Sequence, residues 1–367
     1  MNQHLAEQIL TQVLGWELKE AKENVRLLEE FAELKYDQYQ QYEAGNRFME
    51  SLAVWLNQFQ TEEEKRLAFD FVKKHLVFIS EAEMRHLIRT IYPDYMIPIM
   101  KKVAREIHRK YRGKKQIPAK EVVKTISRQS LFLGLSDGAR LDVFRRSDTR
   151  ISHEQVSISY EIPDKKFGKI IDNMRKDTRA FYEAYPEISM EASKIYGIYL
   201  LDDFSGSGIS YLRTEENPET GQLLWNGKIH KVICELKKVL GESCNFQEIP
   251  IYLFLYLATD AARNSIEEKM KDYKQQYGID IHVCILQKIH KYAPDEAEKE
   301  LMKKYYVKNK VEDSHYHKGK HDFPYLGFDE CSLSLVIYHN TPNNSFTILW
   351  AADPPLFPRV TRHKDVN

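Results

Sequence analysis

The residues best suited to chemistry form one short segment, in which two carboxylates precede a turn rich in serine and glycine. Asp202 and Asp203 follow an apolar run at residues 196–201. The turn that comes next contains Ser205, Gly206, Ser207, Gly208 and Ser210. Glycines let the backbone turn tightly and present several N–H groups to one anion, and serine hydroxyls add further donors. Carboxylates one sugar length upstream can accept hydrogen bonds from ribose hydroxyls, so the pattern predicts a site for a ribose 5-phosphate group.

The elements that position this turn follow from the spacing of apolar residues. An apolar run before the acids predicts a buried strand, and we expect a helix to start near Ile209 and add its positive N-terminal end to the phosphate site. From Ser130 onward, strand-like runs alternate with helical stretches, which predicts βαβ units and a mostly parallel α/β sheet. The predicted strands lie at 131–135, 155–162, 196–201, 251–259, 281–285 and 333–339. Ligands of such sheets bind beyond the carboxyl ends of the strands.

The N-terminal part of the chain has a helical period instead. Leucine and aromatic residues recur three and four positions apart through residues 5–75, and Ser80 with Glu83 forms a capping-box pattern that opens another helix. We therefore predict an all-α domain at residues 1–125 and an α/β domain at residues 126–367.

Composition limits the class of protein. Lys plus Arg equals Asp plus Glu at 54 each, which argues against a generic nucleic-acid binder. The sequence contains no apolar run of about 18 residues and no signal-peptide pattern, so no membrane span is expected. Four scattered cysteines predict buried thiols in a reducing cytoplasm.

Residues 101–128 are strongly basic, with eleven Lys or Arg against two acids, Glu106 and Glu121. A solvated helix face explains such a run in most proteins. The alternative is a contact surface for nucleic acid or another anionic partner, such as a protein of the same complex.

Two other polar groups are candidates for contacts to the base or the sugar. His153 and Glu154 precede a predicted strand. One interpretation is that they serve as acid or base or contact the sugar or the leaving group, and the other is that they form a capped loop that faces solvent. Asn343 and Asn344 follow another strand; their amides can both donate and accept hydrogen bonds to a nucleobase, or they form a turn.

The acidic segment resembles the phosphoribosyl pyrophosphate (PRPP) motif of type I phosphoribosyltransferases. The resemblance implies that Asp202 and Asp203 hold the ribose 2′ and 3′ hydroxyls and that the loop from Ser205 to Ser210 holds the 5′-phosphate. It also implies that the turn after the first core strand binds pyrophosphate as the leaving group. That turn is Ser136, Asp137, Gly138, Ala139 and Arg140.

Two positions depart from the family pattern. Ile209 stands where a second glycine is common, and Asp137 places an acid in the pyrophosphate turn. The resemblance implies Mg²⁺ as cofactor, with Asp137, Asp202 and Asp203 as its candidate ligands.

A broader resemblance covers roughly residues 50–360 and points to phosphoribosyltransferase-like proteins of bacterial conflict operons, including some retron antiphage loci. It is carried by 69–83, 134–140, 152–156, the acidic phosphate loop, 341–344, 349–350 and 356–359. It implies a defence effector that acts on nucleotides, with PRPP or a nucleotide as ligand. A nucleotide N-glycosidase and a non-catalytic nucleotide or PRPP sensor are the alternatives.

Overall fold

The strand–helix alternation after residue 130 folds, in a computed structural model, into one sheet of five parallel strands. Their order across the sheet is β3-β2-β4-β7-β8. The strands are β2 (Ser130–Gly134), β3 (Val156–Ile158), β4 (Gly197–Ser205), β7 (Ile251–Ala258) and β8 (Ile281–Lys288). The predicted α/β class with a mostly parallel sheet is confirmed, and β4 lies at the centre of the sheet.

The structure describes residues 3–111, 117–159, 164–191, 194–217, 220–240, 245–306, 316 and 322–360. The chain divides into two units, one made of residues 1–84 with 290–367 and the other of residues 85–289. The predicted boundary near residue 125 falls within the second unit. Within the described ranges, every helix is too short or too polar to cross a membrane.

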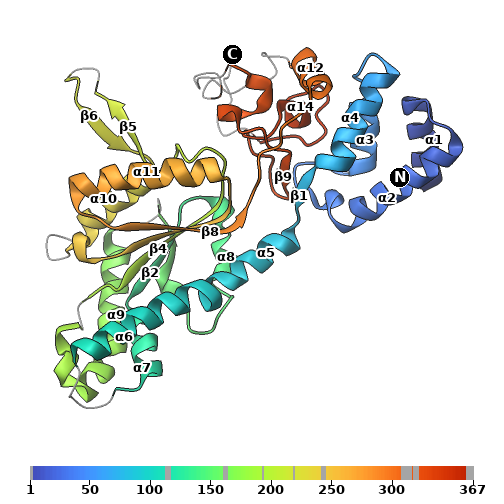
Figure 1. The fold of residues 1–367 in the computed structure, drawn as a ribbon. Helices are drawn as coiled ribbons and strands as arrows, with labels where there is room; N and C mark the ends of the chain where they lie inside the picture. The colour runs from blue at the N-terminus through green and yellow to red at the C-terminus, as the bar shows by residue number, and fades with distance from the viewer. Residues whose placement is uncertain are drawn as a thin grey trace. The chain divides into compact units, whose positions relative to one another are not determined.

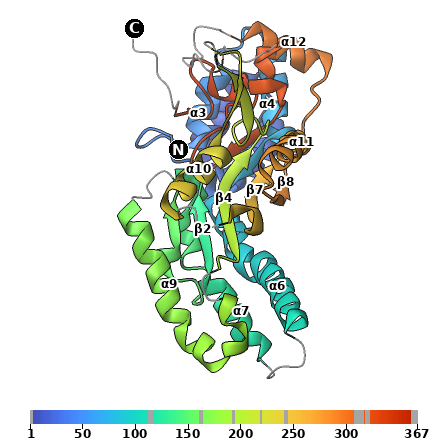
Figure 2. The ribbon, with the colours of Figure 1, turned by 90° about the vertical axis from the view of Figure 1, so that its left-hand side faces the viewer.

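Helices cover both faces of the sheet, as Figures 1 and 2 show for α9 and α6. One face packs the alternate residues Leu131, Leu200 and Leu253 against three helices that together form an aliphatic core. These helices are α9 (Asp164–Ala184), α10 (Lys228–Leu240) and α11 (Asp260–Tyr277). Strand residues alternate between faces, so the intervening residues form the other side of the sheet.

That other face is aromatic. Phe132 stacks on Tyr199 with ring centroids 5.4 Å apart, and Tyr199 stacks on Tyr252 at 5.2 Å. A short π-helix, Ile91–Met96, closes this layer, since its Tyr92 and Tyr95 meet Phe132 and Phe254 edge-on. The remaining helices are α6 (Ile97–Lys110), α7 (Ala119–Arg128) and α8 (Leu141–Phe144), together with the second part of α5 (Glu81–Thr90), within which the boundary between the two units falls.

The first unit is built from both ends of the chain. Its strand β1 (Val77–Ile79) pairs in parallel with β9 (Leu335–Ile337), and the Trp55 indole donates to the Ile348 carbonyl at 2.9 Å. The predicted capping box is confirmed, because the Glu83 N–H donates to Ser80 Oγ at 3.2 Å and the Ser80 N–H donates to Glu83 Oε2 at 2.8 Å. Its helices are α1 (Gln3–Leu14), α2 (Leu18–Leu34), α3 (Phe48–Leu56), α4 (Glu62–His75), α12 (Glu296–Lys304) and α14 (Thr347–Trp350).

Candidate phosphosugar site

The acid pair lies inside the central strand. β4 continues to Ser205, four residues beyond the predicted end at 201, and its register pairs Gly134 of β2 with Leu201. The turn after β2 therefore lies beside the acids. Ser136 Oγ donates to Asp202 Oδ1 and lies 3.4 Å from Asp203 Oδ1. The structure thus brings together the two segments that the sequence singled out separately.

Asp202 is fully buried, with an exposed fraction of 0%, and both of its carboxylate oxygens accept hydrogen bonds. Besides the Ser136 bond to Oδ1, Oδ2 accepts from the Tyr211 hydroxyl at 2.7 Å and from Lys228 Nζ at 2.5 Å. Burial raises the pKa of Asp202, the Lys228 ammonium opposes that rise, and the charge of Asp203 adds to it. Burial also raises the pKa of Tyr211, so its hydroxyl stays protonated and donates. Asp202 is the centre of a closed polar network.

Asp203 occupies a different environment, because it is only half-buried. Its carboxylate lies against Gly138, where an added Cβ would stand 2.2 Å from Asp203 Oδ2. Glycine at position 138 leaves room for the Asp203 carboxylate, which a side chain there would displace. Asp203 is the member of the pair that reaches the surface of the edge.

The predicted phosphate loop, Ser205–Ser210, is held by the start of α11. Thr259, the N-cap of that helix, donates from Oγ1 to the Gly206 carbonyl at 2.5 Å and accepts from the Ala262 N–H at 2.9 Å. Gly208 has a φ of +79°, and a Cβ there would lie 2.6 Å from the Ala262 carbonyl oxygen. Ser205 is buried, Ser207 is half-buried and Ser210 is exposed. The loop is therefore a tight, fixed turn with its later residues at the surface.

The predicted helix near Ile209 is wrong. A β-hairpin follows the loop instead, formed by β5 (Arg213–Glu216) and β6 (Leu223–Asn226), and it projects from the second unit beyond α10 and α11 (Figure 1). Thr214 of β5 and Trp225 of β6 pair across the hairpin, and both residue types favour strands over helices.

Helix α10 begins after the hairpin, but its first turn returns to the loop. The Lys228 N–H donates to the Ser210 carbonyl at 2.9 Å, and the Ile229 N–H donates to the Tyr211 carbonyl at 3.0 Å. Gly227 permits this approach, since its φ is +109° and a Cβ would lie 2.5 Å from Tyr211 O. A helix N-terminus therefore does adjoin the loop, by a longer route than predicted.

The turn after β2 is a single 3₁₀ turn, Asp137–Ala139, with Asp137 exposed. Arg140 follows with a φ of +45°, a left-handed conformation that is strained for a residue with a side chain. Its Nε donates to Asp142 Oδ1 at 3.2 Å, and this bond lowers the pKa of Asp142. The buried Tyr256 hydroxyl donates to the Ala139 carbonyl at 2.6 Å and anchors the turn from β7.

His153 and Glu154 lie at the opposite edge of the sheet. They precede β3, and the amino end of a parallel strand faces away from the carboxyl ends of its neighbours. His153 is exposed, and Glu154 is bound by Arg128 and by Asn173 Nδ2, the latter at 2.8 Å. The structure does not bring these two residues to the acid pair.

Asn343 and Asn344 belong to the first unit, whereas the acid pair belongs to the second. The Asn343 carbonyl accepts from the Phe328 N–H at 2.7 Å. Asn344 is 7% exposed, and its Nδ2 donates to the Phe328 carbonyl at 3.0 Å. Both residues lie in a turn, as the alternative interpretation of this segment had it.

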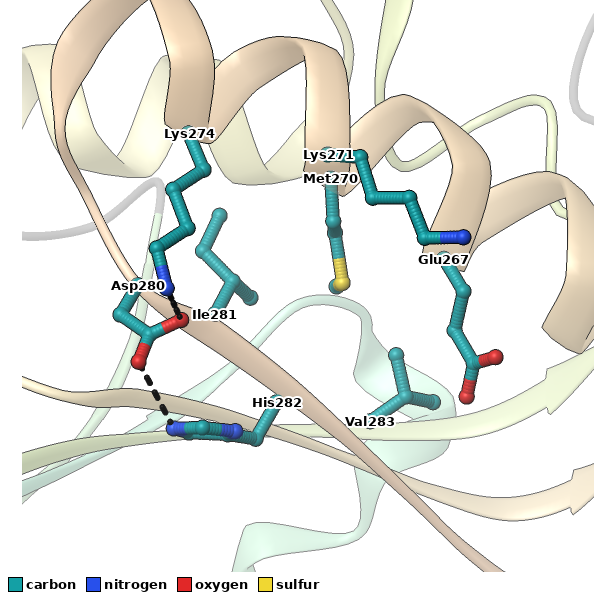
Figure 3. A pocket seen from close by; sticks show the side chains of 8 residues that line it. All are labelled: Glu267, Met270, Lys271, Lys274, Asp280, Ile281, His282 and Val283. Carbon is teal, nitrogen blue, oxygen red and sulfur yellow. Dashed lines mark hydrogen bonds and ion pairs between the residues drawn. The ribbon is translucent and has the colours of Figure 1, made fainter.

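A cavity of 380 Å³ lies away from the acid pair, between α11 and the amino half of β8. Figure 3 shows Lys274 reaching from the helix to Asp280, with Nζ 2.9 Å from Oδ1, and His282 on the strand 3.4 Å from the same carboxylate. The cavity lies where β8, one of the two outermost strands of the sheet, begins. Ligands of such sheets bind where the strands end, so this cavity is not part of the site formed by the acid pair and the predicted phosphate loop.

The side chains at the acid pair are poorly suited to bind Mg²⁺. A Mg²⁺ ligand must offer a free oxygen lone pair at about 2.0–2.1 Å. Asp202 is fully buried and binds Ser136, Tyr211 and the Lys228 ammonium, whose charge repels a metal cation. Asp137 lies in the turn after β2 and Asp203 lies in β4, and no group of three or more metal-binding side chains occurs in the described part of the chain. Asp202 does not fit the role of metal ligand.

Lys228 and Tyr211 complete the network, and the sequence did not identify them. Lys228 is separated from Asp202 by a whole hairpin, so its spacing carries no motif. The available signal was Gly227 followed by a lysine at the start of an amphipathic helical stretch.

Comparison with known proteins agrees with this geometry. A family model described as PRTase-CE matches residues 52–359, which include both turns of the site. No curated protein and no solved structure matches the chain. The match covers most of the sequence, and the chain therefore belongs to the PRTase-CE family, a phosphoribosyltransferase-like family.

Proposed function

We propose that the carboxyl edge of the sheet binds PRPP or the ribose 5-phosphate part of a nucleotide, and that the protein acts at C1 of that ribose. The observation that carries the proposal is the convergence of Ser136 on Asp202 and Asp203, which joins the acid pair to the neighbouring turn. Asp203 holds the ribose hydroxyls, the loop from Ser205 to Ser210 holds the 5′-phosphate, and the turn from Ser136 to Arg140 receives the leaving group.

Such a site favours C1 chemistry through positioning and charge. Cleavage at C1 builds positive charge on the ribose ring, and a carboxylate close to the hydroxyls stabilises that charge. Backbone N–H groups at the turn after β2 can donate hydrogen bonds to the negatively charged leaving group. When water attacks C1 of a nucleotide, the base leaves, and the activity is that of a nucleotide N-glycosidase. When a base attacks C1 of PRPP, pyrophosphate leaves, and the activity is a phosphoribosyl transfer, which pyrophosphate reverses.

Titration calorimetry of the full chain with PRPP, ribose 5-phosphate and nucleoside monophosphates tests the binding. We expect Asp203→Asn to weaken the affinity for the best ligand by at least about tenfold, since it removes a charge-assisted hydrogen bond. Asp272→Asn, at an exposed aspartate on α11, is the matched control and leaves the affinity unchanged. Equal affinities of wild type and Asp203→Asn contradict the proposal.

A non-catalytic sensor of PRPP or nucleotides is the second candidate. The full burial of Asp202 favours it, because one acid of the pair is committed to internal contacts and only Asp203 reaches the surface. Mass spectrometry of each bound ligand after long incubation separates the two candidates. Free base or pyrophosphate supports an enzyme, and intact ligand supports a sensor.

We further propose that the protein is a defence effector that works with an anionic partner. Helix α6 exposes Lys101, Lys102, Arg105 and Arg109 along one side, with Glu106 among them. A mobility-shift series at several salt concentrations tests nucleic acid as that partner. Replacing Lys101, Lys102 and Arg105 by glutamine lowers the salt slope by about one per lost phosphate contact. The same change at Lys237 and Lys238 of α10 is the control, and equal slopes for both variants contradict this role.

A further inference from the structure

Lys228 connects three parts of the site. It is the first residue of α10, and its N–H donates to the Ser210 carbonyl at the end of the phosphate loop. Its Nζ donates to Asp202 Oδ2 at 2.5 Å and lies 5.3 Å from the centroid of the Tyr211 ring. Through Asp202, which also accepts from Ser136, the lysine is linked to the turn after β2. One residue therefore couples the proposed phosphate loop, through its backbone, to the proposed leaving-group turn, through its side chain and Asp202.

The pair between Lys228 and Asp202 has one buried end and one partly open end. The Asp202 side chain is 0% exposed, whereas that of Lys228 is 26% exposed. A carboxylate without solvent needs a permanent partner, because an unpaired buried charge is strongly unfavourable. A lysine ammonium has three donors, and the bond to Asp202 uses one of them. The backbone N–H of Lys228 binds the Ser210 carbonyl, so the partly exposed side chain starts at the end of the loop where the proposed ligand places its anionic oxygens.

This arrangement separates the roles of the two acids. Asp202 has no exposed surface and already binds Tyr211 and Lys228, whereas Asp203 is partly exposed beside Gly138. A divalent cation close to Asp202 would also stand near the ammonium, and like charges repel. The position that a metal ion would need beside Asp202 is thus held by a cation of the protein itself.

We propose that Lys228 is the resident cation of this site: it pairs with Asp202, leaves Asp203 to bind the ribose, and makes binding of the phosphosugar largely independent of Mg²⁺. This inference rests on the proposed function, since it concerns the same ligand. Lys228 acts as a positioning residue through Asp202 and contributes charge to the phosphate loop.

The test is calorimetric titration of the full chain with PRPP, once in buffer containing Mg²⁺ and once in EDTA. Wild type binds in EDTA with an affinity within about threefold of that in Mg²⁺. Lys228→Met loses at least about tenfold in EDTA and recovers part of that loss in Mg²⁺, because Asp202 then lacks its cation. A purely structural lysine would lower both affinities equally. Lys231→Met, at an exposed lysine on the same helix, is the control and behaves as wild type.

Three results overturn the inference with the two buffers and leave the proposed function intact: wild type that binds PRPP only with Mg²⁺, Lys228→Met that binds as wild type in EDTA, or Lys228→Met that loses equal affinity in both buffers. Lys228→Arg keeps the charge and covers the case in which the methionine variant does not fold. We expect it to bind in EDTA within about threefold of wild type, and a folded arginine variant that needs Mg²⁺ overturns the inference. Wild type that binds neither PRPP nor ribose 5-phosphate in either buffer rejects the proposed function, and this inference with it.

Discussion

Charged side chains lie at both ends of the strands of the five-stranded sheet, but their exposure to solvent differs. The amino edge is the side where the parallel strands begin, and the carboxyl edge is the side where they end. At the amino edge, Arg128 bridges Glu154 and Asp177, whose side chains are 32% and 57% exposed. At the carboxyl edge, Lys228 pairs with an Asp202 that is fully buried. Solvent screens the first set, whereas the second depends on its internal partners. The two clusters contain the same types of charged residue, a basic one paired with an acidic one, and the difference between them is the burial of the carboxylate.

The largest difference is expected from removing one cation at each edge. Lys228→Met leaves a buried carboxylate unpaired and should lower the free energy of unfolding by about 3 kcal/mol. Arg128→Met leaves two partly solvated carboxylates and should cost about 1 kcal/mol. Urea unfolding of the full chain, followed by tryptophan fluorescence, measures both. Equal losses would contradict the comparison.

A double variant identifies the cause of the larger loss. Lys228→Met combined with Asp202→Asn removes the charge together with its partner, while the amide can still bond to Tyr211 and Ser136. We expect the double variant to recover at least about half of the loss. A double variant less stable than Lys228→Met alone would show that the ion pair is not the source.

Substitution of two glycines, Gly208 in the loop and Gly168 in α9, tests how tightly the backbone is held at the carboxyl edge. Gly208→Ala places a Cβ 2.6 Å from the Ala262 carbonyl at a φ of +79°, so we expect a loss of about 2 kcal/mol. Gly168→Ala is the matched control, because Gly168 is exposed in α9 with nothing within 4 Å of the added atom. That control should gain about 0.5–1 kcal/mol from helix propensity. Thermal unfolding of both variants measures the contrast, and a Gly208→Ala variant as stable as wild type would show that the loop is not tightly held.

Acidification offers a smaller effect with a definite sign. Burial raises the pKa of Asp202 in the folded state above its unfolded value, so its ionised form costs stability, and this cost is relieved as pH falls through the folded pKa. Without the opposing Lys228 charge, the pKa rises further. The difference in melting temperature between wild type and Lys228→Met should therefore be largest at high pH, where Asp202 is ionised, and shrink on acidification. A difference that grows on acidification contradicts the assignment of Asp202 as the charged partner.

The fold was predictable because its signals are local. Apolar runs such as 131–135 and 251–259 became strands β2 and β7 with nearly the predicted bounds. The two units were not visible in the sequence, since β1 and β9 pair across more than half of the chain. A change of composition near residue 125 marks the approach to β2, which lies inside the second unit.

The site was predictable to the extent that it is contiguous in sequence. The turns at 136–140 and 202–210 were identified, and parallel pairing of β2 with β4 placed them side by side. Lys228 and Tyr211 could not be assigned, because their roles depend on a hairpin that returns the chain to the loop. Glu154 was chosen for its residue type, and strand direction placed it at the other edge.

The smallest effects are expected at that other edge. Glu154→Gln removes a charge from a partly solvated pair with Arg128, so the free energy of unfolding should fall by at most about 1 kcal/mol. The affinity for PRPP should stay within about twofold of wild type, since Glu154 precedes β3 and the acid pair lies at the carboxyl end of β4. His153→Ala is the companion variant, with an exposed side chain and no expected effect on either quantity. Calorimetric titration of both variants beside Asp203→Asn makes the comparison direct. A tenfold loss of affinity in either one would show that ligand contacts extend to both edges of the sheet, and that burial alone does not mark the site.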